Sequence, residues 1–281
     1  MKLFASLLLL ATSAIAQGPI AGRWEGNATV HGQQVPIRIE ITGSGSDLHA
    51  ALLNGPESSP ASGAVFTANH LLLTFNYYAR TLDAMLSNGH LTGTFGTAAT
   101  RYPLSLSSRG TSTNNSGSHA QDINGDWEIA VKSTKGESAW QLRVESSHNP
   151  GDVKAVIQRI DGDTGSLYGS WTGGAYRISH FTAAGPALYS LTPQADGTLL
   201  VSNLLRADVN DQQNLIARRP AQARAAKLVA PTDPTQQTTV KDPSARFKFS
   251  FPDLNGKVVS NTDPQFDGKV VIVAIGGSWW P

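Results

Sequence analysis

The fold class follows from residues 35–41, which have the sequence Val-Pro-Ile-Arg-Ile-Glu-Ile. Ile37, Ile39 and Ile41 alternate with other residues, and this period of two places them on one face of a β-strand. Similar apolar stretches follow at 48–53, 71–75, 82–86, 91–95 and 102–106. Turn sequences such as Asn54-Gly55 separate several of them. Short strands at this spacing predict an antiparallel meander that is closed as a barrel or folded as a sandwich.

The beginning of this meander recurs later in the chain. Ile20-Ala21-Gly22-Arg23-Trp24 is followed, 103 residues further on, by Ile123-Asn124-Gly125-Asp126-Trp127. At the same spacing, the face of Ile37, Ile39 and Ile41 corresponds to Trp140, Leu142 and Val144. Further strand-like stretches lie at 153–160, 166–172, 176–181, 188–191 and 199–204. We interpret the pattern as an internal duplication; two unrelated β segments with similar beginnings are the alternative.

Composition divides the chain into modules and linkers. A Ser/Asn/Gly-rich stretch at 109–121 predicts a flexible linker, and a Pro-rich stretch at 218–245 predicts a second one with a short helix near 221–228. The basic cluster in the second linker is predicted to be solvated, although contact with anionic lipid is the alternative; it comprises Arg218, Arg219, Arg224 and Lys227. The predicted units are β module 1 at 18–108, β module 2 at 122–217 and a C-terminal segment at 246–281.

The N-terminus has the pattern of a secretory signal peptide. One positive charge at Lys2 precedes an apolar run at 3–11, and Ala14-Ile15-Ala16 is a small-x-small cleavage signal. We therefore expect residues 1–16 to be removed on export to the periplasm or outside the cell. No later apolar run approaches the length of a membrane span, so none is expected in the mature chain.

Charge and cysteine content exclude several classes of function. The chain of 281 residues has 22 basic and 21 acidic residues and no cysteine. A net charge of +1 argues against a nucleic-acid partner. Without cysteine there can be no disulfide framework, no thiolate metal site, no lipidated cysteine and no thiol chemistry.

Other candidate sites are weak, and we predict no cofactor and no metal. Asp161-Gly162-Asp163-Thr164-Gly165 resembles the start of a calcium loop, but Thr172 stands where a bidentate Glu is needed, so a plain turn is favoured. His180, within a predicted strand, is expected to be packed or hydrogen-bonded. Ser278 lacks the pattern of a nucleophile elbow. Four tryptophans could line a ligand pocket but are expected to be core residues: Trp24, Trp127, Trp140 and Trp171.

The C-terminal segment has a recognisable pattern. Residues 247–257 read FKFSFPDLNGK, residues 266–273 read FDGKVVIV and residues 276–281 read GGSWWP. This resembles the start of the thioredoxin-like domain of TlpA/ResA-type disulfide oxidoreductases, which is also akin to the AhpC/TSA redoxins. In that family a strand runs into a G-S-W-C-P-x-C motif. Gly277, Ser278, Trp279 and Pro281 match the motif, while Trp280 occupies the position of the first cysteine.

The resemblance implies a thiol-disulfide oxidoreductase family, whose intact members would act on protein disulfides. An indole cannot replace the thiolate of such an enzyme, so we expect this chain to be redox-inactive and without catalytic residues. Only the first strands of a thioredoxin-like α/β fold are expected, including a strand at 270–275 buried on both faces. The Gly-x-Trp motifs also resemble a lipocalin-like barrel opening. The alternative function is therefore a β-barrel module that binds an apolar ligand or a partner protein.

Overall fold

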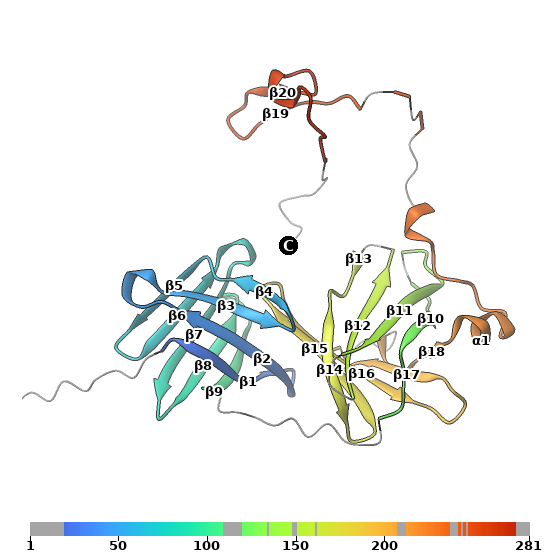
Figure 1. The fold of residues 1–281 in the computed structure, drawn as a ribbon, viewed down its shortest axis with the longest axis horizontal. Helices are drawn as coiled ribbons and strands as arrows, with labels where there is room; N and C mark the ends of the chain where they lie inside the picture. The colour runs from blue at the N-terminus through green and yellow to red at the C-terminus, as the bar shows by residue number, and fades with distance from the viewer. Residues whose placement is uncertain are drawn as a thin grey trace, which may run out of the picture.

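The computed structural model confirms a mainly β protein. It describes residues 20–108, 120–133, 135–147, 151–160, 162–206, 212–236, 241–242, 244–245 and 247–273. The predicted signal peptide and nearly all of the first predicted linker lie outside these residues. Most of the described strands belong to two large antiparallel sheets that lie side by side (Figure 1).

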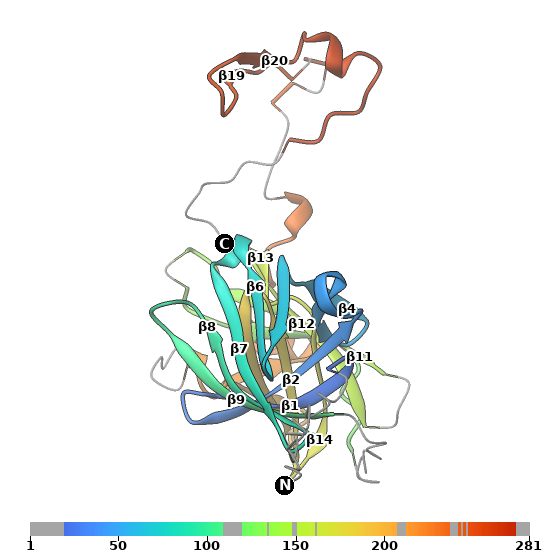
Figure 2. The ribbon, with the colours of Figure 1, turned by 90° about the vertical axis from the view of Figure 1, so that its left-hand side faces the viewer.

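The first sheet is a curled half-barrel of nine strands in the order β4-β3-β2-β1-β9-β8-β7-β6-β5. Figure 2 turns this sheet toward the viewer. Its strands are β1 (Gly22–Val30), β2 (Gln33–Thr42), β3 (His49–Asn54), β4 (Glu57–Pro60), β5 (Gly63–Thr67), β6 (His70–Phe75), β7 (Arg80–Ser87), β8 (His90–Gly96) and β9 (Arg101–Ser108). Ile37, Ile39 and Ile41 are at most 1% exposed, as the alternating pattern predicts.

The second sheet closes into a barrel of eight strands, because β11 pairs with both β10 and β12. The two-residue strand β13 (Gly162–Asp163) is added to β12 outside the ring. The barrel strands are β10 (Gly125–Ala130), β11 (Ala139–Ser146), β12 (Asp152–Arg159), β14 (Leu167–Thr172), β15 (Ala175–Thr182), β16 (Gly185–Pro193), β17 (Leu199–Asn203) and β18 (Leu215–Arg218). Of the two predicted closures, β module 2 therefore has the barrel, whereas the sheet of β module 1 stays open as a half-barrel.

The two sheets begin with the same local structure. The indole N–H of Trp24 donates to the carbonyl of Ile20 at 2.9 Å, and that of Trp127 donates to the carbonyl of Ile123 at 2.9 Å. Trp24 faces Ile39 across β1 and β2, and Trp127 faces Leu142 across β10 and β11. Both residue pairs keep the spacing of 103 seen in the sequence, so the repeat extends to hydrogen bonding and strand register.

The half-barrel and the barrel share a hydrophobic core. Residues Phe181 and Leu188, on β15 and β16, belong to the barrel sheet but are buried in the core cluster of the half-barrel. The ring of Phe181 packs edge-on against Phe95 of β8, with centroids 5.0 Å apart. On the same strands, Ile178 and Tyr189 face the interior of the barrel. Alternating side chains of β15 and β16 thus serve two cores, one on each face.

Beyond β18 the chain forms the short helix α1 (Pro220–Ala225), in the region where a helix is predicted. Two arginines of the basic cluster attach this segment to the barrel instead of being freely solvated. The guanidinium of Arg219 stacks 3.7 Å above the Trp127 ring, and Arg224 forms an ion pair with Glu128. Short 3-10 turns occur at Gly45–Asp47, Asn76–Tyr78, Pro234–Gln236 and Pro264–Phe266.

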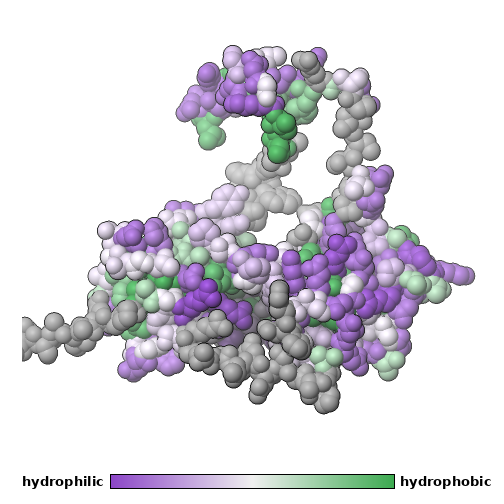
Figure 3. Space-filling view, viewed as in Figure 1, coloured by the Kyte–Doolittle hydropathy of each residue, from purple (hydrophilic) through white to green (hydrophobic). Residues whose placement is uncertain are grey.

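The C-terminal segment differs from the expectation. Only a small hairpin forms, from β19 (Ser250–Pro252) and β20 (Val258–Ser260) around the predicted turn at Asn255-Gly256. The buried strand expected at 270–275 is wrong for its described part: residues 270–273 are not in a strand, and Val270 and Ile272 are 94% and 91% exposed. The physical reason is that no described strand or helix covers them. The described residues contain no thioredoxin fold, and apolar side chains lie on the surface of this segment (Figure 3).

Candidate functional site: a cleft between the half-barrel and the barrel

A cleft of about 310 Å³ lies where the two sheets meet. The half-barrel contributes residues from β1, the following turn, β7 and β9. The barrel contributes the β15–β16 turn, β16, the end of β17 and the residues after it. The cleft is lined by Val30, His31, Arg80, Tyr102, Ala184, Gly185, Pro186, Ala187, Asn203, Leu205 and Arg206.

His31 is placed in the cleft by a tight hairpin turn. His31 and Gly32 form the two-residue connection of β1 and β2, and both have positive φ, at 47° and 79°. This backbone matches the twist of the adjoining strands. The Nδ1 of His31 lies 2.9 Å from the carbonyl oxygen of Leu205, 174 residues away. Because a carbonyl only accepts, Nδ1 carries the proton, and the contact fixes the ring against Tyr102, whose centroid is 6.1 Å away.

Arg80 is the cation deepest in the cleft. Its Nη1 donates to the carbonyl of Ala183 at 3.1 Å, across the junction, and its guanidinium carbon lies 6.0 Å from the centre of the Phe95 ring. Burial lowers the pKa of Arg80, and the nearby Tyr102 and Tyr78 oppose that shift. Among the described residues it forms no ion pair. The guanidinium is therefore partly desolvated without a carboxylate to compensate it.

Gly185 makes room for this guanidinium. Its φ is 131°, and a Cβ atom at this position would lie 2.6 Å from Nη1 of Arg80. Any other residue at 185 would strain the backbone at the start of β16 and would also force the arginine to move.

The barrel side of the cleft is held by Asn203. Its amide nitrogen donates to the Tyr189 hydroxyl at 3.2 Å, and its Oδ1 accepts from the backbone N–H of Leu205 at 3.1 Å. These bonds fix the turn that carries Leu205 and the exposed Arg206. The lining therefore includes two arginines and a histidine, and no carboxylate is among the lining residues that the structure describes.

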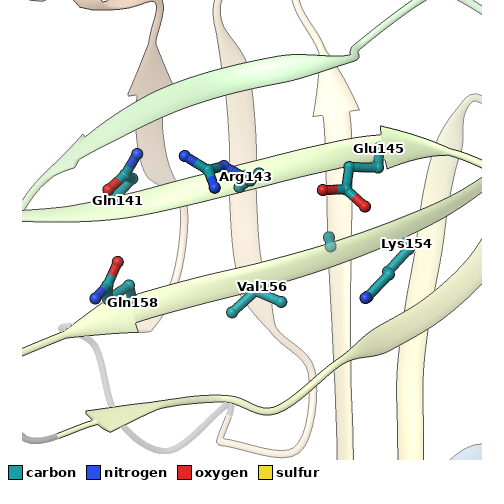
Figure 4. Close-up of a pocket in the computed structure, with 7 residues that line it drawn as sticks. Gln141, Arg143, Glu145, Lys154, Val156 and Gln158 are labelled. Carbon is teal, nitrogen blue, oxygen red and sulfur yellow. The ribbon is translucent and has the colours of Figure 1, made fainter. Parts of the chain in front are cut away.

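A second pocket, of about 230 Å³, lies on the outer face of β11 and β12 (Figure 4). Its charges are already balanced. Arg143 donates to Asp126 at 3.0 Å, and Glu145 stands opposite Lys154 in the strand register. Among the described residues that line this surface, none has an unpaired buried polar atom to attract a ligand, so the cleft is the stronger candidate.

The residues singled out in the sequence lie elsewhere. Positions Gly277, Ser278, Trp279, Trp280 and Pro281 lie outside the described residues, as does Asp161. His180 is partly buried in β15, as expected, and desolvation lowers its pKa while Glu57 opposes the shift.

The tryptophans take structural positions. Trp24 and Trp127 are 4% and 3% exposed and belong to the two cores. Trp140 donates to the buried Glu137 at 3.1 Å, and Trp171 packs on Tyr176. These contacts favour the core interpretation over a pocket lined by tryptophans.

Sequence reasoning missed the residues of the cleft. Arg80 follows Ala79, which has φ 49° and ends a short turn, and neither residue has a motif. The pair His31-Gly32 between apolar stretches is a hairpin signal, but only the tertiary structure brings it opposite Leu205.

Comparison with known proteins gives no match: no protein-family model, no curated protein and no solved structure is similar to the chain. Within the part of the chain that the structure describes, no helix is long and apolar enough to cross a membrane. No described group of three or more His, Asp or Glu side chains is arranged to hold a metal ion.

Proposed function

We propose that this chain is a non-catalytic binding protein in which the half-barrel and the barrel together hold a ligand in the cleft between them. The observation that carries the proposal is the partly buried Arg80, which lines the cleft and has no carboxylate partner among the described residues. Convergent polar groups in a concave, partly apolar site are typical of ligand-binding pockets. Since Phe181 and Leu188 of the barrel sheet are buried in the core of the half-barrel, the two walls of the cleft are held in fixed positions.

A cleft-filling variant tests this function. Ala184 lines the cleft and is exposed, so Ala184→Trp should fill the cleft without disturbing either core. Small aromatic fragments, both charged and neutral, are screened by thermal unfolding against the wild-type chain. We expect stabilising fragments whose effect is lost in Ala184→Trp and kept in the control Ala221→Trp, on the exposed side of α1. Fragments that stabilise both variants equally would contradict binding at the cleft.

A second proposal concerns the C-terminal segment. We propose that residues 246–281 are the start of a TlpA/ResA-like redoxin domain in an exported protein, and that the chain itself is redox-inactive. Support comes from its exposed apolar side chains, since Phe251 is 67% exposed and Leu254 is 106% exposed. Such residues are expected to pack in a domain core. The protein disulfides that intact family members would act on are part of this proposal.

Two measurements test this second proposal. In an insulin-reduction assay with dithiothreitol, the chain should give the background rate, because it has no cysteine. Turnover above background would contradict redox inactivity.

Mass spectrometry of the exported protein should show Gln17 as the first residue; an intact N-terminus would contradict the predicted cleavage after Ala16.

A further inference from the structure

We infer that the cleft binds a small amphipathic anion, with a carboxylate or phosphate group on Arg80 and a short apolar body against the barrel wall. The inference rests on the proposed binding function and adds the chemical class of the ligand. It is carried by three features of the cleft: an incompletely used guanidinium, an apolar wall and the absence of a competing carboxylate among its described lining residues.

Among the residues that the structure describes, the guanidinium of Arg80 leaves donors unused. A guanidinium offers five N–H donors in a planar fork, and here one nitrogen, Nη1, donates to a single carbonyl, that of Ala183. The fork is suited to two parallel bonds with a carboxylate or phosphate. The guanidinium carbon also lies 6.0 Å from the centre of the Phe95 ring, and this contact gives it no hydrogen-bond acceptor.

Charge and burial favour an anion over a neutral ligand. Partial burial of a cation without a counter-ion is unfavourable, and the lowered pKa of Arg80 reflects this desolvation. A bound anion would supply the missing charge where water is partly excluded. Arg206, exposed at the rim of the same cleft, adds a second positive charge that would steer an anion toward it.

The apolar wall limits the rest of the ligand. Val30 comes from the half-barrel, and Pro186, Ala187 and Leu205 come from the barrel. A cavity of roughly 150 Å³ is enough for benzene. The volume of about 310 Å³ therefore has room for a ring-sized body together with an anionic group.

Isothermal titration calorimetry with three aromatic probes tests the inference. Benzoate and phenyl phosphate carry the two anionic groups, and benzamide is a neutral molecule of nearly the same shape as benzoate. We expect at least one anion to bind the wild-type chain at least tenfold more tightly than benzamide. Comparing the two anions shows which of the two groups the cleft prefers.

Variants locate the charge that is responsible. Arg80→Gln should weaken anion binding at least tenfold, and Arg80→Lys should weaken it less, because the charge is kept but the fork is lost. Arg101→Gln, an exposed arginine of the same half-barrel outside the cleft, is the matched control and should bind like the wild type. Arg206→Gln, at an exposed position that should not affect folding, should weaken binding severalfold even if Arg80→Gln unfolds.

The outcomes separate this inference from the proposed function. Equal binding of benzamide and benzoate, lost in Ala184→Trp, would overturn the anion inference and leave the cleft as a binding site. Anion affinity unchanged in Arg80→Gln and Arg206→Gln would also overturn the inference. Binding of all probes unaffected by Ala184→Trp, or no binding of any probe, would overturn both.

Discussion

The half-barrel and the barrel begin alike and are completed differently. Each starts with a glycine and a tryptophan whose indole N–H donates to a carbonyl four residues earlier. The barrel then closes on itself through the pairing of β11 with β12. The half-barrel stays open between β4 and β5, the two ends of its sheet.

This difference shows how an incomplete barrel can still form a buried core. Phe181 and Leu188, on the outer face of the closed barrel, lie in the core of the half-barrel and are 2% and 1% exposed. The barrel is therefore a folded unit whose wall also covers its neighbour. It follows that the half-barrel should depend on the barrel more than the barrel depends on the half-barrel.

The largest expected effect is at that junction. Phe181→Ala should lower the free energy of unfolding by about 3–5 kcal/mol, because it removes a buried aromatic ring from the core of the half-barrel. Urea denaturation measures the loss, and hydrogen exchange should show it in the strands that pack against β15, which are β2, β3 and, through Phe95, β8. The control Val65→Ala, at a position 55% exposed, should have little effect. A loss below about 1 kcal/mol for Phe181→Ala would mean that the half-barrel is stable without this cover.

The shared beginnings should give matched, smaller effects. Trp24→Phe and Trp127→Phe each leave a buried carbonyl, of Ile20 or Ile123, without its indole donor. Each should lower the free energy of unfolding by about 1–3 kcal/mol. Urea denaturation of both variants checks the match. Trp127→Phe also perturbs the stacking of Arg219, so its loss of stability should be equal or somewhat larger. A loss clearly larger for Trp24→Phe would contradict the structural equivalence of the two tryptophans.

His180 should give the junction a pH dependence. Burial lowers its pKa, so the unfolded chain binds the proton more tightly than the folded chain. The stability contributed by the neutral ring is present above the unfolded pKa of about 6.5 and is lost as the pH falls through the lowered, folded pKa. Urea midpoints measured from about pH 8 down to about pH 5 should fall less in His180→Gln than in the wild type.

The matched control for His180 is His90→Gln, at an exposed position at the start of β8. This variant should keep the wild-type pH dependence. An unchanged slope in His180→Gln would show that other groups cause the acid sensitivity.

The smallest expected effect compares two ion pairs of opposite polarity. Arg23 and Glu40 in the half-barrel correspond, 103 residues apart, to Asp126 and Arg143 in the barrel. Arg23→Asp alone places like charges opposite each other and should slightly lower the urea midpoint at low salt. Adding Glu40→Arg copies the barrel arrangement and should restore it. A shift that persists in high salt would contradict an electrostatic cause.

The strands were predictable because their signal is local. The alternation of Ile37, Ile39 and Ile41 requires only neighbouring residues to be read, and the structure buries all three. The strand expected at 270–275 does not form in its described part, because a buried strand also needs neighbours from elsewhere in the chain. Val270 and Ile272 have β-branched side chains, but no described element packs on them.

The candidate site was not predictable in the same way. The sequence drew attention to Trp280 and its neighbours, which lie outside the described residues, while the cleft depends on Arg80 and His31. Neither residue has a motif. Arg80 contacts Ala183, 103 residues away, and His31 contacts Leu205, 174 residues away. No local sequence pattern predicts contacts between residues so far apart.

The sequence by itself determined the β class, the repeated beginning and the absence of cysteine, because alternation, spacing and composition are properties of the chain alone. Only the tertiary structure decided that one repeat closes and the other stays open, and that β15 and β16 face two cores. The same packing left Arg80 partly buried beside a cleft. The physical reason is that the closure of a sheet and the desolvation of a side chain such as Arg80 depend on which distant parts of the chain meet. That is decided only when the whole chain folds.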